Sequence, residues 1–170
     1  MLDAPSDYVY DVITDYKNAY RINPAVIEVQ ILPSEQDDAI RVRNISEHKL
    51  GPLNFEIVWA GDIKEMGNGQ ISVTTLPDHC SFESGSAIWK IRSRGEQTWV
   101  YHESTLKPKF FVPPLIGDFL MKTIMENKAI ATFRKIECNA KLKLERDMGD
   151  ATDRLKTLLH QGEDCRDDMG

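Results

Sequence analysis

The sequence is poor in cysteine, and the cysteines it has are not spaced for a structural role. Cys80, Cys138 and Cys165 are odd in number and far apart, with no Cys-x-x-Cys pair and no histidine at ligand spacing. A disulfide framework needs paired thiols, and a zinc site needs clustered ligands. The composition therefore predicts neither a disulfide-stabilised fold nor a metal site.

The chain also lacks long hydrophobic runs and an excess of positive charge. No uncharged apolar run approaches the roughly 20 residues of a membrane-spanning helix, and no signal-peptide pattern opens the sequence. The formal net charge is −6. This balance argues against nucleic acid or an anionic membrane as the main partner, because phosphate surfaces attract basic proteins.

Catalytic signatures are missing as well. The sequence contains no nucleophile motif, no glycine-rich phosphate loop and no pair of carboxylates at a catalytic spacing. Nothing in it indicates a cofactor. The residues alone thus favour a protein that is not an enzyme, although they leave an enzyme open.

The residues that are present describe an ordinary globular protein. At 170 residues, with 41% hydrophobic and 28% charged residues, the chain is typical of one soluble domain with a real core. Seven acidic and three basic residues fall between Asp147 and Gly170. We therefore expect one folded domain over residues 1–146 and an acidic, mobile tail over 147–170.

Helical periodicity marks both ends of the domain. A stripe of apolar and aromatic residues between Tyr8 and Tyr16 predicts a helix capped by Ser6 or Asp7 and ended before Asn23-Pro24. A much longer helix is predicted from Pro113 to about Arg146. Its apolar face is formed by Leu120, Met121, Ile124, Met125, Ala129, Phe133, Ile136 and Ala140.

Between the helices the period changes to two, and short turns separate the segments. The predicted strands run over residues 26–32, 39–49, 53–65, 70–76, 81–92 and 98–106. Hairpin-length connections predict an antiparallel meander, so the fold class is α+β. The long helix needs a broad apolar partner, which a curved sheet would supply.

Several short motifs resemble START-related helix-grip domains, especially the polyketide cyclase/dehydrase and coenzyme-Q-binding branch. They are Ala4-Pro5, Val9-Tyr10, Val12-Ile13, Asp15-Tyr16, Tyr20, Asn23-Pro24, Val26, Gly85, Trp89, the stretch from Thr98 to Tyr101, Pro113-Pro114 and Ile116-Gly117. The resemblance covers about residues 4 to 140. It implies a helix-grip fold with a ligand cavity between the sheet and the long C-terminal helix.

The sequence departs from this family at its N-terminus. The family has a strand before the Ala-Pro motif, whereas only Met1-Leu2-Asp3 precede it here. Either that strand is lost or the chain starts inside a longer natural protein. A cytoplasmic location is the default expectation, with an upstream targeting segment left open.

Strand alternation assigns residues to the implied cavity. The expected lining is Asn44, Phe55, Ile57, Trp59, Thr75, Ala87, Trp89, Val100, His102 and Ser104 from the sheet, with Leu120, Ile124, Met125 and Phe133 from the helix. His102 is the one ionisable group among them, and it is the candidate general base if the protein is an enzyme. Glu83 is a further candidate for the cavity. His48 and His79 lie near predicted turns, where exposure to solvent is expected.

The sequence leaves three functions open. The first is binding or transfer of an apolar small molecule, such as a lipid, quinone or polyketide-like compound. The second is a cyclase or dehydratase that acts on a polyketide-like substrate through His102, and the third is an interaction module with a filled cavity. The segment Lys109, Phe110 and Phe111 is basic and aromatic, so it is a cavity lid, a transient membrane contact or a hydrophobic staple onto the long helix.

Overall fold

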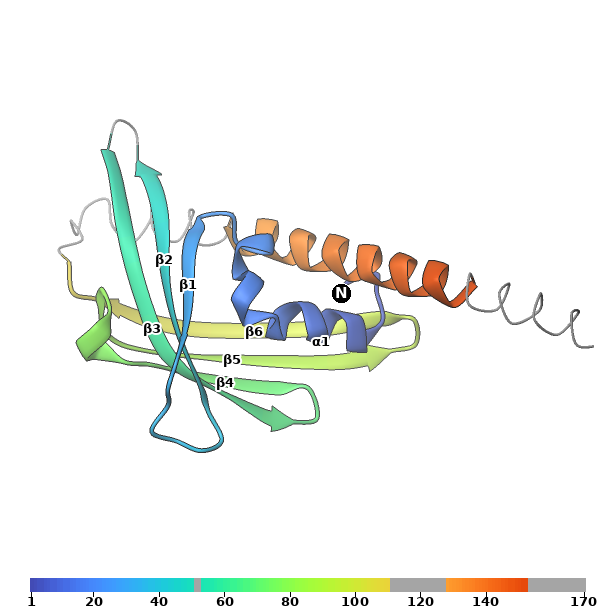
Figure 1. Cartoon of the computed structure of the whole chain (residues 1–170), viewed down its shortest axis with the longest axis horizontal. Helices are drawn as coiled ribbons and strands as arrows, with labels where there is room; N and C mark the ends of the chain where they lie inside the picture. Colours follow the sequence, from blue (N-terminus) through green and yellow to red (C-terminus); the bar gives the residue numbers. More distant parts are fainter. Residues whose placement is uncertain (51–52, 111–127, 153–170) are drawn as a thin grey trace, which may run out of the picture.

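A single six-stranded antiparallel sheet forms the framework of the molecule, with its strands in sequence order (Figure 1). The computed structural model describes residues 1–50, 53–110 and 128–152. The strands are β1 (Val26–Leu32), β2 (Ile40–Leu50), β3 (Leu53–Gly67), β4 (Gln70–Thr75), β5 (Phe82–Arg94) and β6 (Gln97–Pro108). All six predicted strands are present, with ends that differ by no more than two residues from those expected.

The strand ends could be predicted because local chemistry fixes the turns. Asn68 (φ 49°) and Gly69 (φ 67°) connect β3 to β4. Positive φ at both central positions is the hairpin turn that Asn-Gly favours. A Cβ atom on Gly69 would also lie 2.2 Å from the carbonyl oxygen of Ile91, so this turn requires glycine for space as well as for conformation.

Two short helical elements precede the sheet, α1 (Ser6–Thr14) and η1 (Tyr16–Arg21). The helix α1 starts directly after Pro5, and no side chain caps it. The expected cap by Ser6 or Asp7 is therefore wrong, because both residues already lie inside the first turn. The hydroxyls of Tyr10 and Tyr16 donate to the two carboxylate oxygens of Glu65 at 2.6 and 3.1 Å, which ties α1 and η1 to β3.

Residues 128–152 are helical and pack against α1 and the sheet (orange in Figure 1). Ile136 and Ala140 are fully buried and belong to the same core cluster as Val9 and Ile13 of α1. Lys141 also forms an ion pair with Asp3 at 2.8 Å. The N-terminal part of the predicted long helix lies outside the described residues, and the helical residues extend to 152, beyond the end that was expected.

The N-terminal residues contact the edge of the sheet at Thr98 of β6. Leu2 and Thr98 of β6 exchange two backbone hydrogen bonds, of 2.8 and 2.9 Å, as an isolated bridge. The Thr98 hydroxyl, which is completely buried, donates to the carbonyl oxygen of Ala4 at 2.6 Å. This bridge stands at the sheet edge beside β6, where an additional edge strand would pair.

Candidate ligand-binding cavity

A cavity of about 330 Å³ lies between the inner face of the sheet and the helical segments. All six strands contribute to it, and α1, η1 and the helical residue Thr132 cover it. Its lining comprises Ile13, Tyr16, Ala19, Ile22, Asn23, Val26, Asn44, Trp59, Ile63, Ile71, Val73, Thr75, Ser86, Ala87, Trp89, His102, Ser104, Leu106 and Thr132. This lining is largely apolar and aromatic with a few hydroxyl and amide groups, as in small-molecule sites.

Strand register explains which side chains meet in this cavity. Asn44 pairs with Trp59 across β2 and β3, and Trp89 pairs with His102 across β5 and β6. Residues directly opposite in antiparallel strands share a face, so each pair presents both side chains to the same side. Seven residues expected from alternation line the cavity: Asn44, Trp59, Thr75, Ala87, Trp89, His102 and Ser104.

Four of the other expected residues lie elsewhere. Phe55 is 42% exposed and borders a separate depression together with Lys109 and Phe110. Val100 and Phe133 pack against the hydrophobic core, and Ile57 is partly buried without reaching the lining. Leu120, Ile124 and Met125 fall outside the described residues.

Phe55 and Ile57 lie on β3 beyond Trp59, on the side away from Glu65, where α1 and η1 are hydrogen-bonded to the strand. The alternation that places Trp59 inside continues in both directions along β3, to Ile63 at one end and Phe55 at the other. Among the described residues, β3 contributes Trp59 and Ile63 to the lining, together with residues of α1 and η1. A two-residue period predicts the face of a strand correctly, but it contains no information about which length of that face is covered.

Sequence reasoning missed the wall that the N-terminal segments provide. Ile13 and Tyr16 belong to the apolar stripe of the first helix, and that stripe predicted burial without predicting its partner. Ile71 and Val73 alternate with Thr75 along β4, so the period of two could have identified them. Nothing local to the sequence distinguishes Thr132 as a lining residue.

His102 is held in the cavity wall by aromatic contact. Its ring centroid lies 4.0 Å from that of Trp89, and Phe133 packs against the same indole at 6.1 Å, edge to face. Burial lowers the pKa of His102, so the imidazole is neutral at pH 7. Within the described part of the chain no carboxylate hydrogen-bonds to it, since Glu103 accepts from Tyr101 at 2.7 Å and Glu83 pairs with Lys107.

Hydrogen bonding organises the polar side of the cavity. The indole N–H of Trp59 donates to the hydroxyl of Thr75 at 3.2 Å, and Thr75 is only 5% exposed. Gly85 leaves the room for this hydroxyl, because a Cβ atom there would lie 2.6 Å from Thr75 Oγ1. The hydroxyls of Ser86 and Ser104 and the amide of Asn44 line the cavity as well. These groups could orient a carbonyl or hydroxyl oxygen of a bound molecule.

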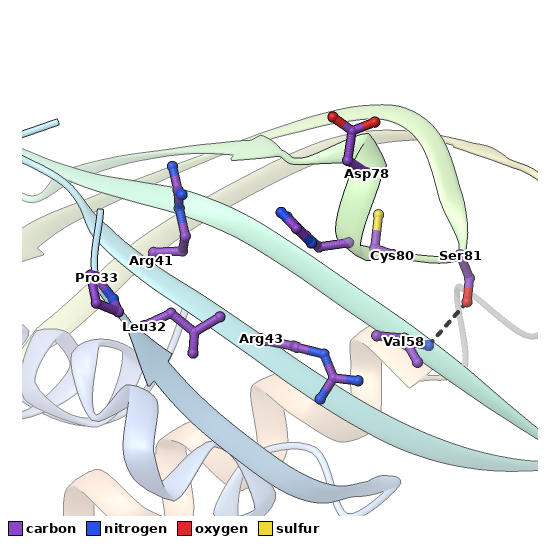
Figure 2. Close-up of a pocket in the computed structure, with 9 residues that line it drawn as sticks. Leu32, Pro33, Arg41, Arg43, Val58, Asp78, Cys80 and Ser81 are labelled. Atoms are coloured by element: carbon purple, nitrogen blue, oxygen red, sulfur yellow. Dashed lines mark hydrogen bonds between the residues drawn. The ribbon is translucent and has the colours of Figure 1, made fainter. Parts of the chain in front are cut away.

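A second depression, of about 720 Å³, is lined by different residues and has a charged wall (Figure 2). Arg41, Arg43 and Asp78 border it, and the backbone N–H of Val58 donates to the hydroxyl of Ser81 at 3.1 Å. Arg41 forms an ion pair with the buried Asp62 at 2.8 Å, which lowers the pKa of that carboxyl. Arg41 is thus engaged in holding β2 to β3, and the charged wall is unsuited to an apolar molecule.

The described ranges show neither a membrane-spanning helix nor a metal cluster. None of their helices is long and apolar enough to cross a membrane. They contain no group of three His, Cys, Asp or Glu side chains arranged to hold a metal ion.

The basic and aromatic segment after β6 is partly described. Phe110 is 41% exposed and packs against Phe82 at 6.4 Å between ring centroids. The ammonium group of Lys109 donates to the carbonyl oxygen of Pro77. Phe111 lies outside the described residues, so a membrane contact by this segment stays a prediction.

Comparison with known proteins gives one family and a set of structural neighbours. A family described as "Polyketide cyclase / dehydrase and lipid transport" matches residues 2–129. No curated protein matches the chain by sequence.

The solved structures that resemble the chain are distant in sequence. The Zhui aromatase/cyclase from a Streptomyces species is 16% identical with a TM-score of 0.66, over 84% of this chain and 90% of that one. A Thermus thermophilus protein is 17% identical with a TM-score of 0.65, over 84% and 93%. A START superfamily protein from Mycobacterium smegmatis is 16% identical with a TM-score of 0.59, over 80% and 92%. At these identities the likeness establishes a shared fold alone.

Proposed function

The chain belongs to the polyketide cyclase/dehydrase and lipid transport family, and from this premise we propose that it binds an apolar small molecule in its inner cavity. The family description covers both a cyclase role and the binding of a hydrophobic ligand. The finer assignment, to binding or transfer, depends on the chemistry of the cavity in this chain.

The observation that supports binding most directly is the lining itself. A cavity of about 330 Å³ is bordered by Trp59, Trp89 and a set of aliphatic side chains. Transfer of an apolar molecule from water into such a space is favourable by roughly 25 cal/mol for each Å² of apolar surface removed from water. The few hydroxyl and amide groups then determine orientation rather than affinity.

The tryptophans make the proposal directly testable. Trp59 and Trp89 line the cavity, whereas Trp99, the third tryptophan of the chain, stacks on Tyr101 and is not part of the lining. The neutral apolar fluorophore N-phenylnaphthylamine should therefore quench tryptophan emission by energy transfer. We expect Trp99→Phe to retain most of this quenching and Trp89→Phe to reduce it.

The matched pair of variants gives the outcome that would overturn the proposal. Quenching that is lost in Trp99→Phe and kept in Trp89→Phe would place the fluorophore outside the cavity, and an absence of saturable quenching would mean that the cavity does not bind. Native mass spectrometry of gently purified protein would then identify a natural ligand, seen as a co-purifying mass that is released on unfolding.

A cyclase or dehydratase activity is the second candidate, and it depends on His102. The imidazole lines the cavity and is neutral because burial lowers its pKa, so it could accept a proton from a bound substrate. We favour binding because no carboxylate of the described residues orients the ring or would stabilise its protonated form.

A further inference from the structure

We propose that the ligand of this cavity has an anionic end, a carboxylate or a phosphate ester, which binds to Lys128 in a cluster that it forms with His48 and Ser46. This inference rests on the proposed function, since it assumes that the cavity holds the apolar part of the same molecule. The cluster lies beside the cavity lining and joins strand β2 to the C-terminal helical residues.

The cluster is a chain of hydrogen bonds with a fixed direction. The Lys128 ammonium group contacts Nδ1 of His48 at 2.5 Å, and Nε2 of His48 lies 2.9 Å from the hydroxyl oxygen of Ser46. An ammonium group can only donate, so Nδ1 accepts and Nε2 carries the proton that Ser46 accepts. The Ser46 hydroxyl in turn donates to the carbonyl oxygen of Ile57 at 3.3 Å.

The surroundings keep His48 in the neutral form that this chain needs. His48 is half-buried and its ring packs on Phe55, with 5.6 Å between centroids. The expectation that this histidine would be exposed is therefore wrong, because Phe55 and Lys128 cover it. Burial and the positive charge of Lys128 lower the pKa of His48, so the ring is an acceptor for Lys128 at pH 7.

Among the described residues, the partner of Lys128 is a neutral acceptor rather than an opposite charge. No carboxylate of the described residues forms an ion pair with it, although other lysines have such partners: Lys64 pairs with Asp38 at 3.0 Å and Lys141 with Asp3 at 2.8 Å. Burial lowers the pKa of Lys128. The side chain of Lys128 is nevertheless exposed, and an accessible positive charge beside a neutral neighbour favours an anion as its next partner.

The position of the cluster relative to the cavity suits one molecule that occupies both. Lys128 precedes the lining residue Thr132 by four residues, which is about one helical turn or roughly 6 Å along the axis. His48 follows the lining residue Asn44 on the same face of β2, at roughly 13 Å for four residues. An apolar body against Trp59 and Trp89 would therefore place a head group at Lys128.

The experiment compares three ligands of equal chain length. Decanol has the apolar chain alone, decanoate adds a carboxylate, and decyl phosphate adds a phosphate ester. Binding is measured by displacement of N-phenylnaphthylamine at low ionic strength, in wild type, Lys128→Gln and Lys135→Gln. Lys135 lies on the same helical segment, is exposed and lines none of the described cavities, so its variant controls for the loss of one positive charge.

We expect at least one anionic ligand to bind more tightly than decanol in wild type. Lys128→Gln should lower the affinity for that ligand about fivefold, because a partly exposed charge-assisted contact contributes modestly. The affinity for decanol should not change. Lys135→Gln should alter neither of these affinities. If decanoate loses more affinity than decyl phosphate in Lys128→Gln, the head group is a carboxylate; if decyl phosphate loses more, it is a phosphate ester.

The outcomes separate this inference from the proposed function. Equal affinities for all three ligands, unaffected by Lys128→Gln, would overturn the inference while the cavity remained a binding site. An equal loss of affinity for the anionic ligand in both lysine variants would mean that general electrostatic attraction causes the effect. This result would also overturn the inference. Binding of none of the three ligands would overturn both proposals.

Discussion

At the scale of single residues, the cavity combines bulky aromatic rings with a few polar groups, of which Trp59 and Thr75 hydrogen-bond to each other. Trp59 fills space and at the same time uses its N–H on Thr75, so the indole adds apolar surface without leaving an unsatisfied donor. His102 differs, because it is stacked on Trp89 and has no hydrogen-bond partner among the described side chains. It is the lining residue whose chemistry separates binding from catalysis.

Replacing His102 with glutamine tests that distinction. Glutamine retains approximate size and hydrogen-bonding capacity, so a protein that only binds should change its affinity by no more than about 1–2 kcal/mol. A protein that uses His102 as a general base should show a catalytic rate about 10²–10⁴-fold lower, while its affinity for the substrate stays largely the same. Isothermal titration and a turnover assay on the identified ligand measure the two quantities.

The pH profile supplies an independent readout for the same residue. A general base works in its neutral form, and burial lowers the pKa of His102. Activity that depends on it should therefore be full at neutral pH and fall through an inflection below about 6.5. A profile that is flat between pH 5 and 8, or that is unaltered by the glutamine substitution, would rule out this role.

At the scale of elements, the C-terminal helical residues are held to the domain by a narrow buried face. Ile136 and Ala140 are completely buried, whereas Ile130 is 52% exposed. Ion pairs at the margin, such as Lys143 with Asp11 and Lys141 with Asp3, join exposed groups, and pairs of this kind contribute little because water and salt screen them. Apolar burial is therefore the main attachment of this helix.

Two isoleucines on this helix allow a matched comparison. Ile136→Ala removes three buried carbon atoms from the core cluster that also contains Val9 and Ile13, and we expect a loss of about 2–4 kcal/mol in the free energy of unfolding. Ile130→Ala, the same change at an exposed site, should alter stability by less than about 0.5 kcal/mol. Chemical denaturation of both variants measures the difference, and similar values would show that the helix does not dock through Ile136.

At the scale of the whole molecule, the sheet, α1, η1 and the helical residues 128–152 surround a core and a neighbouring cavity. The buried core residues extend from Leu2 to Ala140. The helical residues after Arg146 are exposed as far as residue 152. The division into a domain over residues 1–146 and a separate acidic segment over 147–170 therefore remains our proposal for the chain.

Truncation after Arg146 tests this division. Because no residue of the described core follows Ala140, we expect the thermal midpoint and the affinity for N-phenylnaphthylamine to be unchanged within error. The full chain is the control. A lower midpoint or weaker binding on truncation would show that the acidic segment packs on the domain.

The sequence by itself determined the elements, and the tertiary structure decided which of their faces are enclosed. Strand ends follow from turn chemistry at sites such as Asn68-Gly69, and side-chain alternation correctly predicts that Trp59 and Trp89 share a face, because both signals are local. The outcome at Phe55 is not local, because the segments packed against the inner face of β3 decide which part of that face lines the cavity. Contact between His48 and Lys128, 80 residues apart in the chain, likewise exists only after the helix has docked on the sheet.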